Sequence, residues 1–224
     1  MTEYAEVARA VSARGEVVLR RRTTEHAADV LELRVNGVFV MDTHETSTEE
    51  ALAAGALDLV EDPRDVVVGG LGLGYTVQRL LADPRVERVA VVEVEEALIG
   101  WMRDGTVPHG PAVLADRRVQ VVAADLVTAV AEATRTYDLV LLDVDNGPGY
   151  LVHDTNAEVY DAPFLTEVHA LLNPGGVLVV WSADRAPELE QTLRTVFGGC
   201  TEQALDVELQ GRATAYYLYS ARRA

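Results

Sequence analysis

Residues 66–76 decide the fold of this chain; they read Val66-Val67-Val68-Gly69-Gly70-Leu71-Gly72-Leu73-Gly74-Tyr75-Thr76. The first part is a short apolar run, typical of a strand that is buried on both faces of a sheet. The glycines let the backbone turn tightly and approach a ligand closely, and a helix begins after them. A strand, a glycine-rich turn and a helix in this order predict an α/β protein with a ligand site at the turn.

The chain after this turn alternates apolar runs with helical patterns. We expect strands at 65–69, 88–93, 119–123, 137–143 and 177–181, with helices at 75–82, 95–103, 126–134, 158–172 and 187–197. Asn173-Pro174-Gly175-Gly176 ends the fourth helix, and 201–209 and 214–220 form a closing hairpin around Gln210-Gly211. The pattern predicts a doubly wound, mostly parallel sheet of about seven strands with a C-terminal antiparallel hairpin.

The residues before the turn predict a small antiparallel β-unit. Residues 1–14 are expected to be a short helix or a loose end. Val17–Arg22 and Val30–Val35 alternate apolar and polar residues, as half-buried strands do. Asn36-Gly37 is a strong hairpin signal, and Val38–Met41 is the returning strand. The basic run within the first of these strands is expected to lie on a solvated edge.

A polar segment, Asp42–Glu50, connects this unit to the rest of the chain. Ser47 or Thr48 is a suitable N-cap for a helix that runs to about residue 60. We therefore expect an N-terminal β-unit over residues 1–47 and a Rossmann-like cofactor-binding domain over residues 48–224.

Composition and charge restrict the partners. The 224 residues include 19 basic and 36 acidic side chains, for a net charge of −17. Such a surface repels phosphate backbones and anionic lipids, so we expect neither nucleic acid nor a membrane as a partner. A small-molecule or peptide acceptor, neutral or cationic, fits better. No apolar run suits a signal peptide or a membrane span, which predicts a cytoplasmic protein. The single cysteine, Cys200, excludes an intramolecular disulfide, and no metal-ligand spacing is present.

Three acidic residues follow predicted strands at the edge where open α/β sheets bind ligands. Glu93 ends the second strand, about twenty residues beyond the glycines, where a carboxylate reaches the hydroxyls of a ribose. Asp125 follows the third strand and suits an adenine amine, and Asp143 closes the fourth. These placements predict a site for a nucleoside-type cofactor.

This arrangement resembles the class I methyltransferase fold, which binds S-adenosylmethionine. In that family the glycine turn wraps the methionine end, an acid after strand 2 holds the ribose and an acid after strand 3 holds the adenine. The resemblance implies these cofactor-binding residues: Gly69, Gly70, Gly72, Gly74, Tyr75, Glu93, Val94, Asp125, Leu126 and Asp143.

One branch is more similar. The turn at 66–74 looks like the G-G-G-D-G-G motif of spermidine synthases, and Val91-Val92-Glu93-Val94-Glu95 resembles their second strand. Residues 137–148, YDLVLLDVDNGP, resemble their catalytic strand and loop, Y-D-(V/I)-I-…-D-S-S-D-P. The small N-terminal β-unit and the polar segment are theirs as well. The resemblance implies a homodimer formed through the N-terminal β-unit.

The departures from that motif concern the amine-binding positions. Gly72 stands where spermidine synthases have an Asp that holds the propylamine of decarboxylated S-adenosylmethionine. Thr48 corresponds to a Tyr, Phe39 to a Gln and Asn146 to the second loop Asp, although Asp145 can shift into that place. An Asp beside the methionine carboxylate of the parent cofactor would repel it, and Gly72 removes that repulsion.

We therefore expect intact S-adenosylmethionine and transfer of a methyl group to a small-molecule or peptide acceptor. The alternative is a polyamine aminopropyltransferase that uses decarboxylated S-adenosylmethionine, which the net charge favours. A third hypothesis is a degenerate member that binds a nucleoside without turnover.

The acids of the catalytic loop are the first candidates for chemistry. Asp143 ends a buried strand, and burial raises a carboxyl pKa towards that of a useful base; alternatively it only orders the loop or the cofactor amine. Asp145 is the second catalytic candidate. The candidates for binding the acceptor lie on the polar segment and on the loop after the fourth strand: His44, Glu45, Asn146, Tyr150 and His153.

Overall fold

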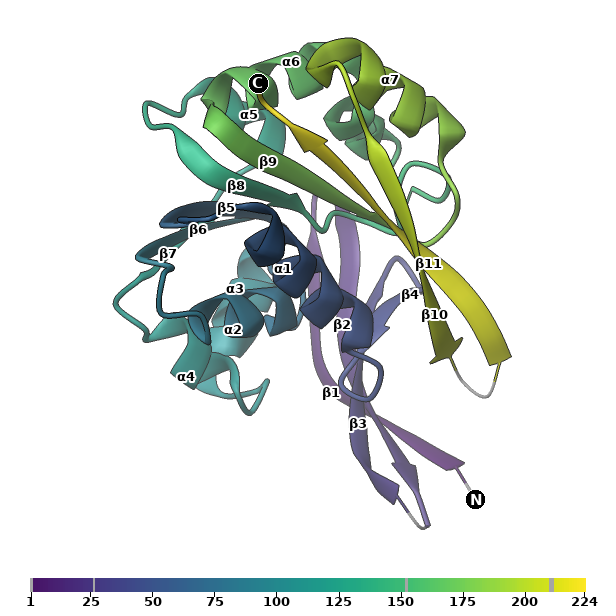
Figure 1. Cartoon of the computed structure of the whole chain (residues 1–224). Coiled ribbons are helices and arrows are strands. Elements are labelled where there is room, and N and C mark those ends of the chain that lie inside the picture. Colours follow the sequence, from purple (N-terminus) through teal and green to yellow (C-terminus); the bar gives the residue numbers. More distant parts are fainter. Residues whose placement is uncertain (1, 26, 152, 210–211) are drawn as a thin grey trace.

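Two β-sheets organise the chain, and helices cover both faces of the larger one (Figure 1). The computed structural model describes residues 2–25, 27–151, 153–209 and 212–224. The smaller sheet is antiparallel and formed by the N-terminal strands; the larger one follows it in the sequence.

The larger sheet has seven strands in the order β10-β11-β9-β8-β5-β6-β7. Its strands are β5 (Asp65–Gly69), β6 (Arg88–Glu93), β7 (Val119–Ala123), β8 (Tyr137–Leu142), β9 (Leu172–Ser182), β10 (Thr201–Leu209) and β11 (Arg212–Arg222). The first five are parallel, and the last two form the antiparallel hairpin. The predicted doubly wound sheet with its closing hairpin is confirmed; the predicted turn residues Gln210-Gly211 lie outside the described residues.

The helices form two layers (Figure 1). One face of the sheet carries α1 (Ser47–Leu59), α2 (Tyr75–Leu81), α3 (Glu96–Asp104) and the short α4 (Gly110–Leu114), which was not predicted. The other carries α5 (Leu126–Ala131), α6 (Ala162–Leu171) and α7 (Pro187–Phe197), with a 3-10 helix, η1 (Asp154–Tyr160). Each layer has its own buried apolar cluster, because alternate residues of the strands point to opposite faces.

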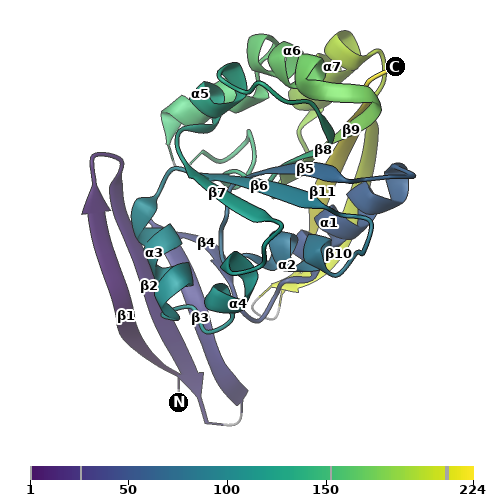
Figure 2. The same ribbon diagram turned by 90° about the vertical axis from the view of Figure 1, so that its left-hand side faces the viewer.

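The N-terminal sheet packs against the α1 layer. Its strands are β1 (Thr2–Ser12), β2 (Gly15–Thr24), β3 (Ala27–Val35) and β4 (Val38–Asp42), paired in chain order. Leu19 and Leu33 belong to the same apolar cluster as Leu52 of α1. In Figure 2 this sheet stands beside α3, with β1 as its outermost strand. Asn36 and Gly37 both have positive φ, as the predicted hairpin turn requires.

Three local predictions are wrong. Residues 1–14 contain a long strand, which alternation did not reveal because β1 is exposed along most of its length. The predicted helix 158–172 is divided, because the Asp161 side chain accepts a hydrogen bond from the Phe164 N–H and starts α6 anew. The helix ends before residues 173–176 as predicted, but the strand expected at 177–181 is longer, because β9 already begins at Leu172.

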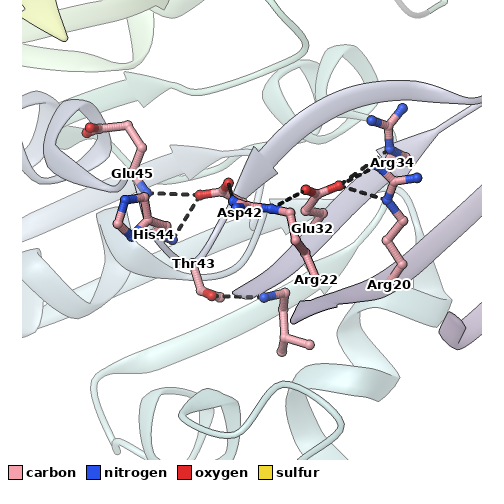
Figure 3. Close-up of polar contacts among 9 residues, drawn as sticks. Arg20, Arg22, Glu32, Arg34, Asp42, Thr43, His44 and Glu45 are labelled. Carbon is pink, nitrogen blue, oxygen red and sulfur yellow. Dashed lines mark hydrogen bonds and ion pairs between the residues drawn. The ribbon is translucent and has the colours of Figure 1, made fainter. Parts of the chain in front are cut away.

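The basic run Arg20-Arg21-Arg22 is also not a solvated edge, because β2 lies between β1 and β3. Arg20 and Arg22 both pair with the buried carboxylate of Glu32, at 2.7 and 2.8 Å. Figure 3 shows this network continuing to Asp42 at the end of β4. The basic residues therefore neutralise carboxylates inside the N-terminal sheet.

Candidate active site

The site lies where the strand order of the large sheet reverses. β6 pairs with one side of β5 and β8 with the other, so the two crossovers diverge at the end of β5. The Gly70 N–H donates to the Val92 carbonyl at 2.9 Å, and the Asp143 N–H donates to the Gly69 carbonyl at 2.8 Å. These bonds bring the carboxyl ends of β5, β6 and β8 together at one opening.

The turn after β5 requires glycine. Gly70 has φ +93°, and a Cβ at this position would stand 2.1 Å from the Asp143 carbonyl oxygen. Gly72 has φ +49°, and its nearest neighbour is the Met41 sulfur of β4. The backbone therefore adopts a conformation that L-residues disfavour, and at Gly70 it passes close to Asp143, directly after β8.

A cleft opens above this turn, between the N-terminal sheet and the carboxyl edge of the large sheet. From the large sheet and its loops it is lined by Gly70, Gly72, Val92, Glu93, Val94, Glu95, Leu98, Ala124, Asp125, Leu126, Asp143, Val144, Asp145, His153, Asn156 and Val159. From the N-terminal sheet it is lined by Arg14, Val17, Leu33, Val35 and Val40. Apolar residues thus form much of the wall, and carboxylates supply most of its charge.

Glu93 and Asp125 are fixed by backbone amides. Glu93 is buried and accepts from the N–H groups of Leu71 at 2.9 Å and Glu95 at 2.8 Å. Burial nevertheless raises the pKa of Glu93. Asp125 is the N-cap of α5, and one of its oxygens accepts from two amides of the first turn. Both carboxylates keep lone pairs for donors such as ribose hydroxyls or an adenine amine.

Asp143 follows β8 and lines the cleft. Its carboxylate accepts from the Thr76 hydroxyl of α2 at 2.9 Å. Burial raises the pKa of Asp143, and the Thr76 hydrogen bond opposes that rise. Among the residues that the structure describes, no Arg or His side chain forms an ion pair with Asp143. The site thus holds a carboxylate that a bound cation would neutralise.

Asp145 and the loop after β8 are tied to the N-terminal sheet by Arg14. Asp145 has φ +62° and accepts from the Asn156 side-chain amide at 2.8 Å. Arg14, in the turn between β1 and β2, donates to the side-chain oxygen Oδ1 of Asn156 at 3.0 Å and lies 3.7 Å from Glu95. Arg14 and Asn156 were not predicted, because neither lies in a recognisable motif.

The polar segment before α1 is held by Asp42. Its Oδ1 accepts from the N–H groups of His44 at 2.8 Å and Glu45 at 2.9 Å, and its Oδ2 accepts from Arg22 at 3.2 Å (Figure 3). The Asp42 side chain is 2% exposed. The start of α1 is therefore connected through one carboxylate to the buried ion network of the N-terminal sheet.

The predicted site residues divide into two groups. Those that line the cleft are Gly70, Gly72, Glu93, Val94, Asp125, Leu126, Asp143, Asp145 and His153. Those placed outside its lining in the described chain are Gly69, Gly74, Tyr75, His44, Glu45, Asn146 and Tyr150.

Local contacts explain the second group. The Tyr75 ring stacks against His109 at 4.7 Å between centroids, so it faces the start of α4 and not the cleft. A Cβ at Gly69 would press on Leu126 and one at Gly74 on Met102, so both glycines face the protein interior. Asn146 donates to the Phe39 carbonyl at 3.4 Å, which connects the loop to β4. Tyr150 is exposed at the surface.

The residues present fit a nucleoside with a cationic substituent. The glycine turn provides a backbone surface that a Cβ would fill, and Glu93 and Asp125 supply two hydrogen-bond acceptors. Asp143 completes the lining with a carboxylate that lacks a cationic partner in the described chain.

The family model for the spermine/spermidine synthase domain matches residues 45–197. This chain belongs to that family. The matched residues run from the polar segment before α1 to the end of α7, so they include the glycine turn and the loop that follows β8.

Two curated members of the family illustrate the likeness. The chain is 29% identical over 167 residues to polyamine aminopropyltransferase 2 of Pseudomonas aeruginosa, covering 70% of this chain and 46% of the relative. It is 28% identical over 185 residues to polyamine aminopropyltransferase of Aeropyrum pernix, covering 71% and 57%. The chain therefore spans about half the length of the curated relatives that it matches.

Solved structures show the same fold. Spermidine synthase from Thermotoga maritima superposes with a TM-score of 0.81 at 16% identity, covering 98% of this chain and 73% of the other. Spermidine synthase in complex with the transition-state analogue AdoDATO gives a TM-score of 0.80 at 16% identity, covering 98% and 74%. The likeness includes the N-terminal sheet, because almost the whole chain is covered.

The prediction of methyl transfer is wrong. The spermine/spermidine synthase domain and the polyamine aminopropyltransferase names of its relatives support the alternative that the sequence left open. Gly72 removes one acidic side chain from the glycine turn, but other carboxylates of the site remain. Asp143 and Asp145 still line the cleft, and Glu49 is buried near Asp143. An anionic methionine carboxylate would meet these charges.

Two further findings concern the ranges that the structure describes. None of their helices is both long and apolar enough to cross a membrane. No group of three or more His, Cys, Asp or Glu side chains is arranged there to hold a metal ion.

Proposed function

We propose that the chain transfers an aminopropyl group from decarboxylated S-adenosylmethionine to an amine acceptor of the polyamine type. The observation that carries the proposal is the Asp143 carboxylate, which lines the cleft, accepts from Thr76 and has no cationic partner in the described chain. Membership of the spermine/spermidine synthase family supports it. A donor without a carboxylate and an amine acceptor both bring positive charge to this acidic site.

We propose that residues 48–224 hold the donor and that the N-terminal sheet covers it. Glu93 accepts from the ribose hydroxyls and Asp125 from the adenine amine, while Val94 and Leu126 line the apolar wall beside them. Gly70 and Gly72 allow the backbone to pass close to the sulfonium end. Arg14 closes the cleft from the N-terminal side through Glu95 and Asn156.

The reaction is a displacement at carbon. The acceptor nitrogen forms a bond to the aminopropyl carbon attached to the sulfonium, and the carbon–sulfur bond breaks, leaving neutral methylthioadenosine. The protein orients the two reactants and accepts the proton that the acceptor ammonium must lose before attack. Asp143 is the proposed acceptor of that proton, since burial raises the pKa of its carboxyl towards neutrality. Asp145 orients the acceptor and His153 lines the cleft beside it, whereas His44, Glu45, Asn146 and Tyr150 lie outside the lining and receive no role here.

The expected homodimer stays a prediction. β1 is the edge of the N-terminal sheet and exposes Tyr4, Val7 and Val11, which would be covered by a second copy. Light scattering at micromolar concentration should give twice the mass of one chain; a monomer would contradict it.

Turnover of the purified chain tests the function. Incubation with decarboxylated S-adenosylmethionine and a series of linear diamines should yield one methylthioadenosine for each aminopropylated amine. Asp143→Asn should reduce kcat by about 100-fold or more, because general-base contributions are of that order. Failure of every amine to yield methylthioadenosine from this donor would refute the proposal.

A further inference from the structure

Glu49 occupies an unusual place for an acidic residue. It lies in the first turn of α1, where acids normally stay at the surface and benefit from the helix dipole. Its side chain is instead 8% exposed, whereas the neighbouring Glu50 is exposed. Glutamate is almost never buried without a partner. The fold therefore buries the Glu49 carboxylate, whereas the Glu50 carboxylate, one position along the helix, faces solvent.

The groups around Glu49 carry no positive charge. Its Oε2 accepts from the Thr48 hydroxyl at 2.9 Å. The charged and titratable groups that act on it are Asp143 and Glu45. Burial raises the pKa of the Tyr75 and Tyr216 phenols, and the charge of Glu49 adds to that rise. Burial and Asp143 raise the pKa of Glu49. No Arg or His of the described residues forms an ion pair with it.

The sheet register places the side chains of Trp181 and Tyr216 on the same face of the large sheet as α1. Leu142 of β8 pairs with Val180 of β9 at the end of this ladder, and Asp143 and Trp181 are the next residues of the two segments. Leu141 and Val179 belong to the apolar cluster beneath α1, and alternation along a strand directs Asp143 and Trp181 to that same face. The Tyr216 ring packs against Trp181 at 4.9 Å between centroids.

Trp181 provides an independent sign of a missing ligand. It is 6% exposed, and its indole N–H is buried without a hydrogen-bond partner in the described chain. Buried donors are nearly always satisfied, so this orphan marks a place for an acceptor atom; an ammonium has none, and Trp181 would meet the cation with its ring and not with its N–H. Glu49, Asp143, Trp181 and Tyr216 thus form an inner cluster of two carboxylates and two aromatic rings, a combination that binds an organic cation.

We propose that Glu49 is the second ammonium-binding carboxylate of the site and faces Asp143 across a primary ammonium group. The inference rests on the proposed function, which supplies such a group from two sources. One is the aminopropyl end of the donor, and the other is the amine acceptor. Glu49 ionises when the ammonium binds, because the cation replaces the solvation that burial removed.

The test compares Glu49→Gln with the matched control Glu50→Gln, one position along the same helix turn. Calorimetry measures the binding of decarboxylated S-adenosylmethionine and of methylthioadenosine, which lacks the aminopropyl group. Steady-state kinetics measure KM for the diamine. If Glu49 holds the donor ammonium, Glu49→Gln weakens donor binding about tenfold or more and leaves methylthioadenosine within about twofold. If it holds the acceptor ammonium, the KM for the diamine rises by a similar factor instead.

A proton count separates a charge role from a shape role. Ligand binding to the wild-type chain near neutral pH should release protons, seen as a dependence of the heat on the ionisation enthalpy of the buffer. Glu49→Gln should lose that release and Glu50→Gln should keep it. Thermal unfolding confirms that both variants are folded.

The outcomes are distinct. In the first outcome, the wild-type chain turns over and Glu49→Gln has the same donor affinity, diamine KM and proton release as wild type. That result overturns the role of Glu49 and leaves the proposed function standing. A wild-type chain that neither binds the donor nor turns over overturns the proposed function and this inference together.

Discussion

Replacing Asp42 tests whether the buried ion network of the N-terminal sheet supports the start of α1. Asp42→Ala removes two hydrogen bonds from backbone amides, at 2.8 and 2.9 Å, and the contact to Arg22 at 3.2 Å. Asp42→Asn keeps an oxygen for the two amides and removes the charge. Asp29→Asn is the matched control, because Asp29 lies in the same sheet, pairs with Arg21 at 3.6 Å and is half exposed.

The magnitude follows from burial. Hydrogen bonds to a charged group are worth about 1.5–3 kcal/mol each, but the His44 amide can regain water because that residue is exposed. Arg22 keeps Glu32 at 2.8 Å, so it is not left buried without a partner. We expect Asp42→Ala to lower the free energy of unfolding by about 3 kcal/mol and Asp42→Asn by about 1–2 kcal/mol. Asp29→Asn should cost less than about 0.5 kcal/mol.

Urea unfolding measures these differences, and donor titration measures the effect on the site. Asp42→Asn should weaken donor binding or turnover by more than the loss of folded protein accounts for, because residues 43–46 lose the carboxylate that holds them. If Asp42→Ala costs no more than Asp29→Asn, the network does not hold this segment, and the reasoning is refuted.

Three further predictions concern the cleft and Glu49. Gly70→Ala should abolish donor binding in calorimetry, since a left-handed φ costs an L-residue about 1–2 kcal/mol and the new Cβ overlaps the Asp143 carbonyl; Gly100→Ala in α3, where a Cβ meets nothing within 4 Å, should be neutral or stabilising. Arg14→Ala should weaken donor binding severalfold with little change in melting temperature, and equal affinity would show that Arg14 does not close the cleft. Without ligand, the raised pKa of Glu49 makes the stability of the fold depend on pH. The contribution of the protonated carboxyl is fully present below 4.5, the ordinary pKa of Glu, and is lost as the pH rises through the raised pKa. Glu49→Gln should therefore melt higher than wild type at about pH 9 and nearly equal to it at about pH 5; parallel melting curves at both pH values would contradict this.

The large sheet was predictable because its information is local. Each parallel strand is an apolar run ended by a polar or glycine residue, and each turn carries its own signal. The doubly wound, mostly parallel class followed from the alternation of strand and helix. β1 was missed for the opposite reason, since an exposed strand has no buried face and hence no alternation to read. The break at Asp161 was readable, because an acidic N-cap followed by Pro163 is a known helix start.

The candidate site was predictable only where a motif fixed it. Glu93, Asp125 and Asp143 each follow a strand, and sheet topology alone brings such positions to one edge. Arg14 reaches the same cleft from a different sheet, through contacts to Glu95 and Asn156 that no sequence window contains. The polar wall of the site therefore depends on tertiary packing of the N-terminal sheet.

The mistaken choice of methyl transfer has the same physical origin. The missing carboxylate at Gly72 is visible because the glycine motif is compact, and its loss argues for an anionic ligand group. Glu49 lies in a first helical turn, where an acid is ordinary, so nothing in the sequence shows that its side chain is buried. The charge that a ligand meets is the sum of the side-chain charges around it, and these come from distant parts of the chain: Glu49 from α1, and Asp143 and Asp145 from the loop after β8. That sum became visible only when the fold placed α1 against the carboxyl end of β8, and it favours a cation.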